Sequence, residues 1–201
     1  MDISIKKDLA SNWFKLLQNA ICDDILKIEK NKVNFQSTSW NRSSKKDEGG
    51  GEYRILKNGK IFEKVLELGS GCGYQSDVLS HFCEEVHAIE RIKPLVTKAR
   101  ENLSELKIKN VLFKYGDGFT DWDKKLKYDG VLCAAAPRQY PQDLIDCLNI
   151  NSKIVIPVGN SKSQQLHVIT KLEGDDIKED VFEEVAFVPM LSGTSVDGND
   201  S

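Results

Sequence analysis

After residue 64 the chain alternates short apolar segments with amphipathic ones, and this alternation limits the folds it can adopt. The apolar segments have the length of strands, and the segments between them place apolar side chains three and four residues apart, as helices do. The expected strands are Val65–Leu68, Val86–Glu90, Val111–Tyr115, Gly130–Ala134 and Lys153–Pro157, followed by an antiparallel pair formed by Leu166–Leu172 and Val181–Met190. Strands separated by helices usually pair in parallel. The sequence therefore predicts an α/β fold with a doubly wound, mostly parallel sheet and a C-terminal antiparallel hairpin.

A glycine-rich turn joins the first expected strand to the first expected helix. Gly69, Gly71 and Gly73 occupy alternate positions directly after Val65–Leu68. Glycine suits a turn where the backbone passes close to a ligand, because a Cβ atom would occupy the space of that ligand. Taken alone, the same turn is equally compatible with a tight strand-to-helix connection that binds nothing.

Two acidic residues indicate which ligand this turn would accept. Glu90 ends the second strand, 21 positions after Gly69, where a carboxylate can accept hydrogen bonds from both ribose hydroxyls of a nucleoside. Dinucleotide-binding folds carry G-x-G-x-x-G, whereas this turn is G-x-G-x-G and follows Glu67, whose negative charge would oppose a pyrophosphate. A cationic cofactor without phosphates fits better, which favours S-adenosylmethionine over NAD.

A third element follows the third strand. In Gly116-Asp117-Gly118 the carboxylate of Asp117 can accept a hydrogen bond from an adenine amino group, and Gly118 lets the base lie close. A glycine–aspartate–glycine triplet is also common in ordinary turns. Its position after the other two elements makes it supporting evidence for a nucleoside site.

Six blocks of the sequence, in this order, resemble the protein-L-isoaspartate O-methyltransferase family: VLELGSGCGYQSDVLS, VHAIERI, YGDGFTDW, YDGVLCAAAPRQYP, IVIPVG and FVPMLSG. The resemblance implies a class I methyltransferase domain with a Rossmann-like fold over residues 65–193. It also implies S-adenosyl-L-methionine as cofactor and methyl transfer to isoaspartyl carboxylates of damaged proteins, which begins their repair. The cofactor-binding residues implied are Glu67, Gly69, Ser70, Gly71, Gly73, Gln75, Glu90, Arg91, Asp117 and Gly118. No catalytic residue is carried over, because the family's Thr/Ser-Ile-Ser-Gln/Ala-Pro-like segment upstream of the cofactor strand has no counterpart in this sequence.

Residues 1–64 differ in composition and are expected to form an appendage. Residues 9–28 predict an amphipathic helix, and the polar, glycine-rich residues 36–51 predict a loop. Asn58-Gly59 lies between two apolar runs and predicts a β-hairpin, whose second strand would continue directly into Val65–Leu68. The segments WFKLLQNAICDDILKIE and TSWNRSSKKDEGGGEYRILKNGKIFEKV resemble the beginning of oxygen-dependent coproporphyrinogen III oxidase, without that family's downstream catalytic part. Residues 194–201 are expected to be a disordered tail.

The composition favours no charged partner and no metal. The net charge is −3, from 28 basic and 31 acidic residues, which gives no overall attraction to nucleic acid or an anionic membrane. Five scattered cysteines without a C-x-x-C pair predict buried free thiols, and the three histidines lack the spacing of metal ligands. No apolar run reaches the roughly 20 residues of a membrane helix, and the N-terminus lacks signal-peptide features. These features predict a cytoplasmic protein, which we expect to be a monomer.

Three functions remain compatible with the sequence. The first is an active methyltransferase that acts on isoaspartyl proteins. The second is a protein that binds the cofactor but is catalytically impaired, since the substrate segment has no counterpart. The third is a fragment of a coproporphyrinogen oxidase, which the missing downstream sequence disfavours.

Overall fold

The computed structural model describes residues 3–29, 33–41, 50–56, 61–174 and 176–198. The chain divides into two compact units, Met1–Ile61 and Phe62–Ser201. Across the described ranges, no helix is both long enough and apolar enough to cross a membrane.

The first unit contains one long helix and a two-stranded sheet. Helix α1 spans Ile3–Ile28, six residues longer at its N-terminal end than the sequence pattern predicts. Strands β1 (Phe35–Asn41) and β2 (Gly50–Leu56) pair in antiparallel orientation. The predicted loop over 36–51 is therefore wrong at both of its ends, and its residues 42–49 lie outside the described residues. Pairing with β2 supplies the backbone hydrogen bonds of β1 whatever the polarity of its side chains, which composition alone does not reveal.

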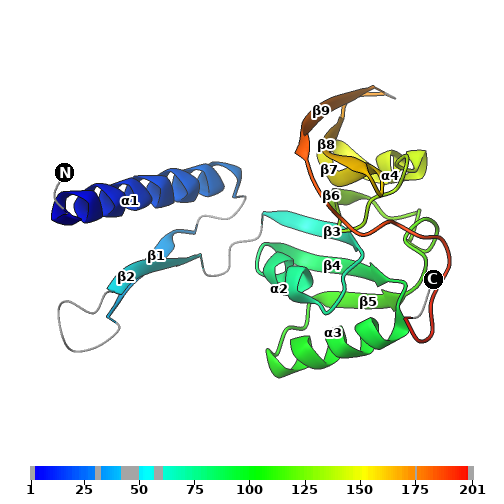
Figure 1. Ribbon diagram of the computed structural model, residues 1–201, viewed down its shortest axis with the longest axis horizontal. Helices are drawn as coiled ribbons and strands as arrows, with labels where there is room; N and C mark the ends of the chain where they lie inside the picture. Colours follow the sequence, from blue (N-terminus) through cyan, green and yellow to red (C-terminus); the bar gives the residue numbers. More distant parts are fainter. Residues whose placement is uncertain (1–2, 30–32, 42–49, 57–60, 175, 199–201) are drawn as a thin grey trace. The chain divides into compact units, whose positions relative to one another are not determined.

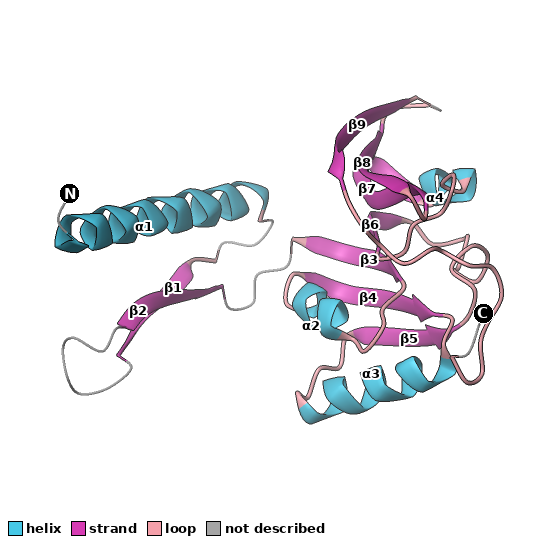
Figure 2. Ribbon diagram, viewed as in Figure 1, coloured by secondary structure: helices cyan, strands magenta, loops and turns pink. Residues whose placement is uncertain are grey.

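The second unit has seven strands and three helices (Figure 1). In chain order they are β3 (Phe62–Leu68), α2 (Tyr74–Ser80), β4 (Cys83–Glu90), α3 (Lys93–Glu105), β5 (Val111–Tyr115), β6 (Tyr128–Cys133), α4 (Gln142–Asp146), β7 (Leu148–Asn160), β8 (Ser163–Lys171) and β9 (Ile177–Glu184). The strands form one sheet in the order β5-β4-β3-β6-β7-β8-β9 (Figure 2). Strands β3 to β7 pair in parallel, whereas β8 and β9 are antiparallel. The predicted α/β fold is confirmed.

The strand order places a ligand site at one edge of this sheet. From the central strand β3 the chain first builds outward through β4 and β5, and it then returns to the other side of β3 with β6 and β7. In open α/β sheets, ligands bind beyond the carboxyl ends of the strands where this reversal occurs. That point lies beside Leu68 and Cys133, the final residues of β3 and β6.

Side chains of β3 alternate between the two faces of the sheet, as strand geometry requires. Val65 packs with Val86 and with Leu79 of α2 in a small apolar cluster. Leu66 and Leu68 belong to a larger cluster that includes buried side chains of β6, α4 and β7. The central strand is buried on both faces, which explains its short, uninterrupted apolar sequence.

The hairpin predicted at Asn58-Gly59 is not formed. Strand β2 pairs with β1, while both edges of β3 are occupied by β4 and β6 in parallel orientation. The Asn-Gly turn signal is local, and the parallel pairing of β3 with β4 from Phe62 to Leu68 and with β6 over Val65–Leu68 outweighs it. The turn residues themselves lie outside the described residues.

Two further expectations about the C-terminal part are wrong. Strand β9 ends at Glu184, so the predicted strand Val181–Met190 is only half formed, and its second half is an irregular segment. The expected tail after residue 193 is packed at Ser195, which is 3% exposed and forms a bridge with Ile92. The amide of Ser195 donates to the carbonyl of Arg91 at 2.7 Å, and its own carbonyl accepts from the amide of Lys93 at 2.9 Å.

The cysteines are free thiols, as expected, but they are not all buried. Cys72 is exposed in the glycine-rich turn, whereas Cys22, Cys83, Cys133 and Cys147 are buried. Burial raises the pKa of the Cys133 and Cys147 thiols to about 11. At neutral pH both are therefore protonated and chemically inert.

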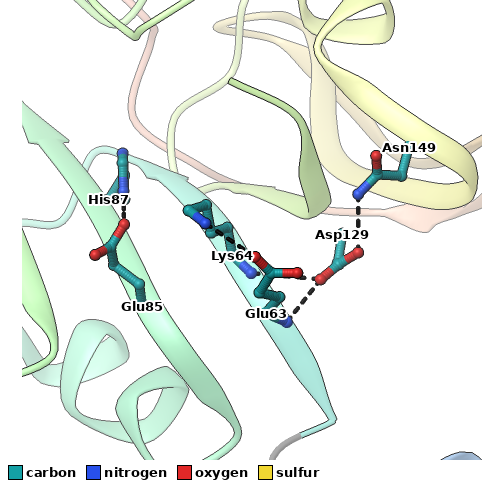
Figure 3. Close-up of polar contacts among 6 residues, drawn as sticks. All are labelled: Glu63, Lys64, Glu85, His87, Asp129 and Asn149. Atoms are coloured by element: carbon teal, nitrogen blue, oxygen red, sulfur yellow. Dashed lines mark hydrogen bonds and ion pairs between the residues drawn. The ribbon is translucent and has the colours of Figure 1, made fainter. Parts of the chain in front are cut away.

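Asp129 of β6 fixes the beginning of the central strand (Figure 3). Its Oδ2 atom accepts hydrogen bonds from the backbone amides of Glu63 at 2.6 Å and Lys64 at 3.3 Å. Its Oδ1 atom accepts from the side-chain amide of Asn149, in β7, at 3.0 Å. One carboxylate thus joins three neighbouring strands at the end of the sheet opposite to the glycine-rich turn.

Replacing Asp129 by alanine should lower the free energy of unfolding by about 0.5–1.5 kcal/mol, the net range for a typical intramolecular hydrogen bond, because the donors to Asp129 are exposed or half-buried and water can replace it. Urea denaturation of the variant and the wild-type chain measures the difference. Asp146→Ala is the matched control, because it removes an exposed carboxylate from the nearby helix α4. Its effect should stay within about 0.5 kcal/mol. Equal destabilisation by both substitutions would contradict the assigned role of Asp129.

Candidate functional site

A cavity of about 360 Å³ lies at the carboxyl ends of β3 and β4. Its wall includes Leu68, Ile89 and Glu90 from these strand ends and Ala134 from the loop after β6. The volume lies within the range of small-molecule sites, which are mostly apolar with a few polar groups that orient the ligand. We call this cavity the strand-end pocket. It occupies the position that the strand order indicates for a ligand.

The glycines of the turn divide into two kinds. Gly69 and Gly71 line the strand-end pocket, and both have positive φ angles, +81° and +55°. A Cβ atom on Gly71 would meet no protein atom within 4 Å, so it would point into open space beside the pocket. Gly73 does not line the pocket. A Cβ atom there would lie 2.8 Å from Leu103 and 3.1 Å from Ala99, so Gly73 allows α2 to pack against α3.

Glu90 connects the end of β4 to the turn. Its Oε2 atom accepts a hydrogen bond from the amide of Gly71 at 2.9 Å, and its Oε1 atom accepts from the amide of Ile92 at 2.9 Å. The residue is 5% exposed and lines the strand-end pocket. Each carboxylate oxygen can accept a further hydrogen bond, which leaves acceptors for two ligand hydroxyls. Arg91 also lines the pocket, and its Nε atom donates to the carbonyl of Gly193 at 3.1 Å.

Glu67, Ser70 and Gln75 lie behind the turn and are not among the residues that line the pocket. Glu67 is fully buried, and it accepts hydrogen bonds from the hydroxyl of Ser76 and from Nε2 of Gln75. Burial raises the pKa of Glu67 and the charge of Glu90 adds to this, while the two hydrogen bonds act in the opposite direction. The hydroxyl oxygen of Ser70 is buried without a hydrogen-bond partner among the described residues. In this structure Glu67 holds the first turn of α2 against β3.

The Gly116-Asp117-Gly118 element is only partly brought into the pocket. Gly118 lines it, and a Cβ atom there would lie 2.9 Å from Cε of Met190. The carboxylate of Asp117 instead accepts hydrogen bonds from the amides of Phe119 at 2.7 Å and Gly193 at 2.5 Å. Asp117 therefore closes its own turn and ties the C-terminal segment to it.

The C-terminal segment 187–190 forms a wall of the strand-end pocket that strand and helix patterns did not reveal. Val188, Pro189 and Met190 line the pocket. The amide of Ala136 donates to the carbonyl of Val188 at 2.8 Å, and the amide of Met190 donates to the carbonyl of Ala136 at the same distance. In the sequence, the F-V-P-M motif and the Ala-Ala-Pro stretch are recognisable only by their resemblance to the family. Their mutual contact explains why both occur.

Gln164 fixes the beginning of the same segment. Its side chain is 6% exposed, donates from Nε2 to the carbonyl of Phe187 at 3.0 Å, and accepts from the amide of Phe187 at 2.7 Å. After β9 ends, the side chain of Gln164 thus makes the two hydrogen bonds to the backbone of Phe187 that a neighbouring strand would otherwise make. The wall of the pocket is therefore attached both to β8, through Gln164, and to the loop after β6, through Ala136.

The sequence model of the family "Protein-L-isoaspartate(D-aspartate) O-methyltransferase (PCMT)" matches residues 52–195. The chain belongs to this family. The match begins 13 residues before the start that the sequence blocks predicted (65 − 52) and ends two residues later (195 − 193). It thus includes residues 52–56 of β2, which the sequence pattern places in the appendage.

Curated relatives carry the family name. The protein-L-isoaspartate O-methyltransferase of Methylobacillus flagellatus is 42% identical over 144 residues, which cover 70% of this chain and 64% of the relative. That of Pseudomonas aeruginosa is 43% identical over 131 residues, which cover 65% of this chain and 62% of the relative. The chain thus spans less than two thirds of the length of the curated relatives it matches.

Solved structures agree with the fold. A Plasmodium falciparum beta-aspartate methyltransferase (PCMT), solved in complex with S-adenosyl-L-homocysteine, matches with a TM-score of 0.54 and 28% identity over 64% of this chain and 66% of that one. Another protein-L-isoaspartate O-methyltransferase matches with a TM-score of 0.58 and 24% identity over 63% of this chain and 41% of that one. The sheet order and these matches confirm the class I methyltransferase fold.

Proposed function

We propose that this chain binds S-adenosyl-L-methionine in the strand-end pocket and transfers its methyl group to isoaspartyl carboxylates of damaged proteins. The observation that carries the proposal is Glu90, a buried carboxylate at the pocket whose two oxygens also hold Gly71 and Ile92. The family match and the ligand of the Plasmodium falciparum structure support the same cofactor. The proposed domain boundaries are 1–64 for an appendage and 65–193 for the methyltransferase domain, with residues up to Gly198 contributing to the pocket.

The described residues fit this cofactor better than a dinucleotide. The strand-end pocket is mostly apolar, and Glu90 and Arg91 are the charged residues among those that line it. A pyrophosphate would face the Glu90 carboxylate, whereas ribose hydroxyls would donate to it. The open space beside Gly71 allows a ligand to approach the backbone. We propose Gly69, Gly71, Glu90, Arg91 and Gly118 as direct contacts, and Glu67, Ser70, Gly73, Gln75 and Asp117 as residues that shape the turns around them.

The chain has to orient the substrate more than it has to activate it. S-adenosylmethionine supplies an electrophilic methyl group on a sulfonium. A carboxylate is already ionised at neutral pH, with a usual pKa near 4, so no general base is required. The chain's contribution is then to hold the two reactants in line and to exclude water, which can supply several kcal/mol. The apolar wall formed by Val188, Pro189 and Met190 suits this task.

Two measurements test the proposal on the full chain. Calorimetric titration with S-adenosylhomocysteine tests the pocket, and radiolabelled methyl transfer to an isoaspartyl peptide, with the aspartyl isomer as control, tests the reaction. Binding together with isomer-specific methylation is the expected result. Binding without methylation would instead favour the impaired protein, and absence of binding would contradict both. The resemblance of residues 9–65 to coproporphyrinogen oxidase supports no separate function. A cytoplasmic, monomeric protein without nucleic-acid or membrane partners remains part of the proposal.

A further inference from the structure

A second, open pocket of about 490 Å³ lies beyond the end of β7. We call it the basic pocket, because Arg138 and Lys162 line it together with Gly159, Asn160 and Ser161. Arg138 belongs to the loop after β6, and the other four residues form the end of β7 and its turn to β8. The amide of Gly159 donates to the carbonyl of Pro137 at 3.0 Å and joins the two parts.

The two cations of the basic pocket, Arg138 and Lys162, pair with no acidic side chain in the part of the chain that the structure describes. Among the described residues, no ion pair or side-chain hydrogen bond involves the guanidinium of Arg138 or the ammonium of Lys162. The turn that carries Lys162 is well defined: Oδ1 of Asn160 accepts from the amides of Lys162 at 2.8 Å and Ser163 at 3.3 Å. Both cations are exposed and solvated by water, so a carboxylate can approach them together, and the planar guanidinium of Arg138 matches its geometry.

The basic pocket lies close to the strand-end pocket along the chain. Ala135 lines the strand-end pocket, and Arg138 follows three residues later. Three residues span at most about 10 Å. An extended peptide covers the same distance with about three residues. Both pockets also lie at the carboxyl edge of the parallel strands, because β6 and β7 run in the same direction.

We propose that the basic pocket binds a second carboxylate of the peptide substrate, an acidic side chain within about three residues of the isoaspartyl residue. The inference rests on the proposed function, which places the reacting carboxylate in the strand-end pocket. The chain would thus prefer isoaspartyl sites in acidic sequence. Through the same chemistry the basic pocket could bind the terminal carboxylate of a short peptide, and the test separates these two sources.

Fluorescence anisotropy of labelled isoaspartyl peptides, with saturating S-adenosylhomocysteine, tests the inference without requiring turnover. One peptide carries glutamate two residues after the isoaspartyl residue, and its partner carries glutamine there; both have amidated ends. A third peptide has glutamine and a free C-terminus. We expect the glutamate peptide to bind about fivefold more tightly than its glutamine partner at low salt, the upper range for an exposed ion pair. The difference should vanish near 1 M salt, where the screening length is about 3 Å.

The double variant Arg138→Gln/Lys162→Gln should bind the two amidated peptides equally and leave the affinity for the glutamine peptide unchanged. Lys109→Gln is the matched control, because Lys109 is an exposed cation just before β5 and is not among the residues that line either pocket. Equal binding of both amidated peptides by the wild-type chain would overturn the inference alone. A gain from the free C-terminus but not from glutamate would assign the basic pocket to chain ends and likewise overturn it. If no peptide binds, the proposed peptide substrate fails as well.

Discussion

Glu90→Ala should weaken the binding of S-adenosylhomocysteine by about tenfold to a hundredfold. The substitution removes the proposed acceptor for the ribose hydroxyls. It also leaves the amides of Gly71 and Ile92 without their partner, so the turn loses its attachment to β4. A buried group left unsatisfied costs about 1–3 kcal/mol, which corresponds to this range of affinity. Isothermal titration calorimetry of the full chain measures the effect.

Glu84→Ala provides the matched control, since Glu84 is an exposed carboxylate on the same strand. Its affinity should equal that of the wild-type chain. A thermal melt of each variant separates lost binding from lost folding. If Glu90→Ala stays folded and keeps the wild-type affinity, the strand-end pocket is not the cofactor site.

Gly71→Ala and Gly73→Ala should fail in different ways, although the two glycines are only two positions apart. At Gly73 a methyl group would collide with Leu103 and Ala99 at a φ angle of +87°. Overpacking costs about 1–3 kcal/mol and the left-handed backbone costs about 1–2 kcal/mol, so this variant should lose about 2–5 kcal/mol of stability. At Gly71 the methyl group would meet no protein atom within 4 Å. The Gly71→Ala variant should therefore lose only about 1–2 kcal/mol of stability, the cost of the left-handed backbone.

Gly71→Ala should instead lose at least about tenfold in affinity for S-adenosylhomocysteine, because its methyl group would occupy space that the ligand needs. Urea denaturation and calorimetry on both variants give the two quantities separately. An alanine at position 71 that binds as well as glycine would mean that this glycine serves the turn alone.

The sequence predicted the central sheet well because its signals there are local and agree with the fold. Strand β5 has the predicted limits, and β4 ends at Glu90 as predicted. Strand β7 continues three residues further than predicted (160 − 157), because its pairing with β8 extends to Asn160. It begins five residues earlier than predicted (153 − 148), where Leu148 pairs with Tyr128 of β6. The hairpin at Asn58-Gly59 was predicted wrongly because the strand partners of β3 come from β4 and β6, which a local turn signal does not report.

The residues of the candidate site also divide into those that local sequence signals predicted and those whose roles depend on the fold. Four of the predicted residues that line the strand-end pocket are Gly69, Gly71, Glu90 and Gly118. The sequence pattern of strand ends followed by glycines and a carboxylate at fixed spacing was sufficient to select them. Met190 lies more than 50 residues after Cys133, the last residue of β6, which it contacts. No spacing rule could therefore place Met190 at the strand-end pocket. The roles of Glu67 and Asp117 also required the fold, because their partners Ser76 and Gly193 compete with a ligand for the same carboxylates.

The contact between the loop after β6 and residues 187–190 joins two segments that are synthesised at different times. The central strands and the glycine-rich turn leave the ribosome long before Val188, Pro189 and Met190, which complete the pocket wall. A nascent chain can therefore build its sheet while its pocket is still open on one side. By the proposed function, a bound cofactor would gain the contacts of this wall only once residues 188–190 have been synthesised. We therefore expect a chain that stops shortly after β9 to bind S-adenosylhomocysteine more weakly than one that includes residues 188–190.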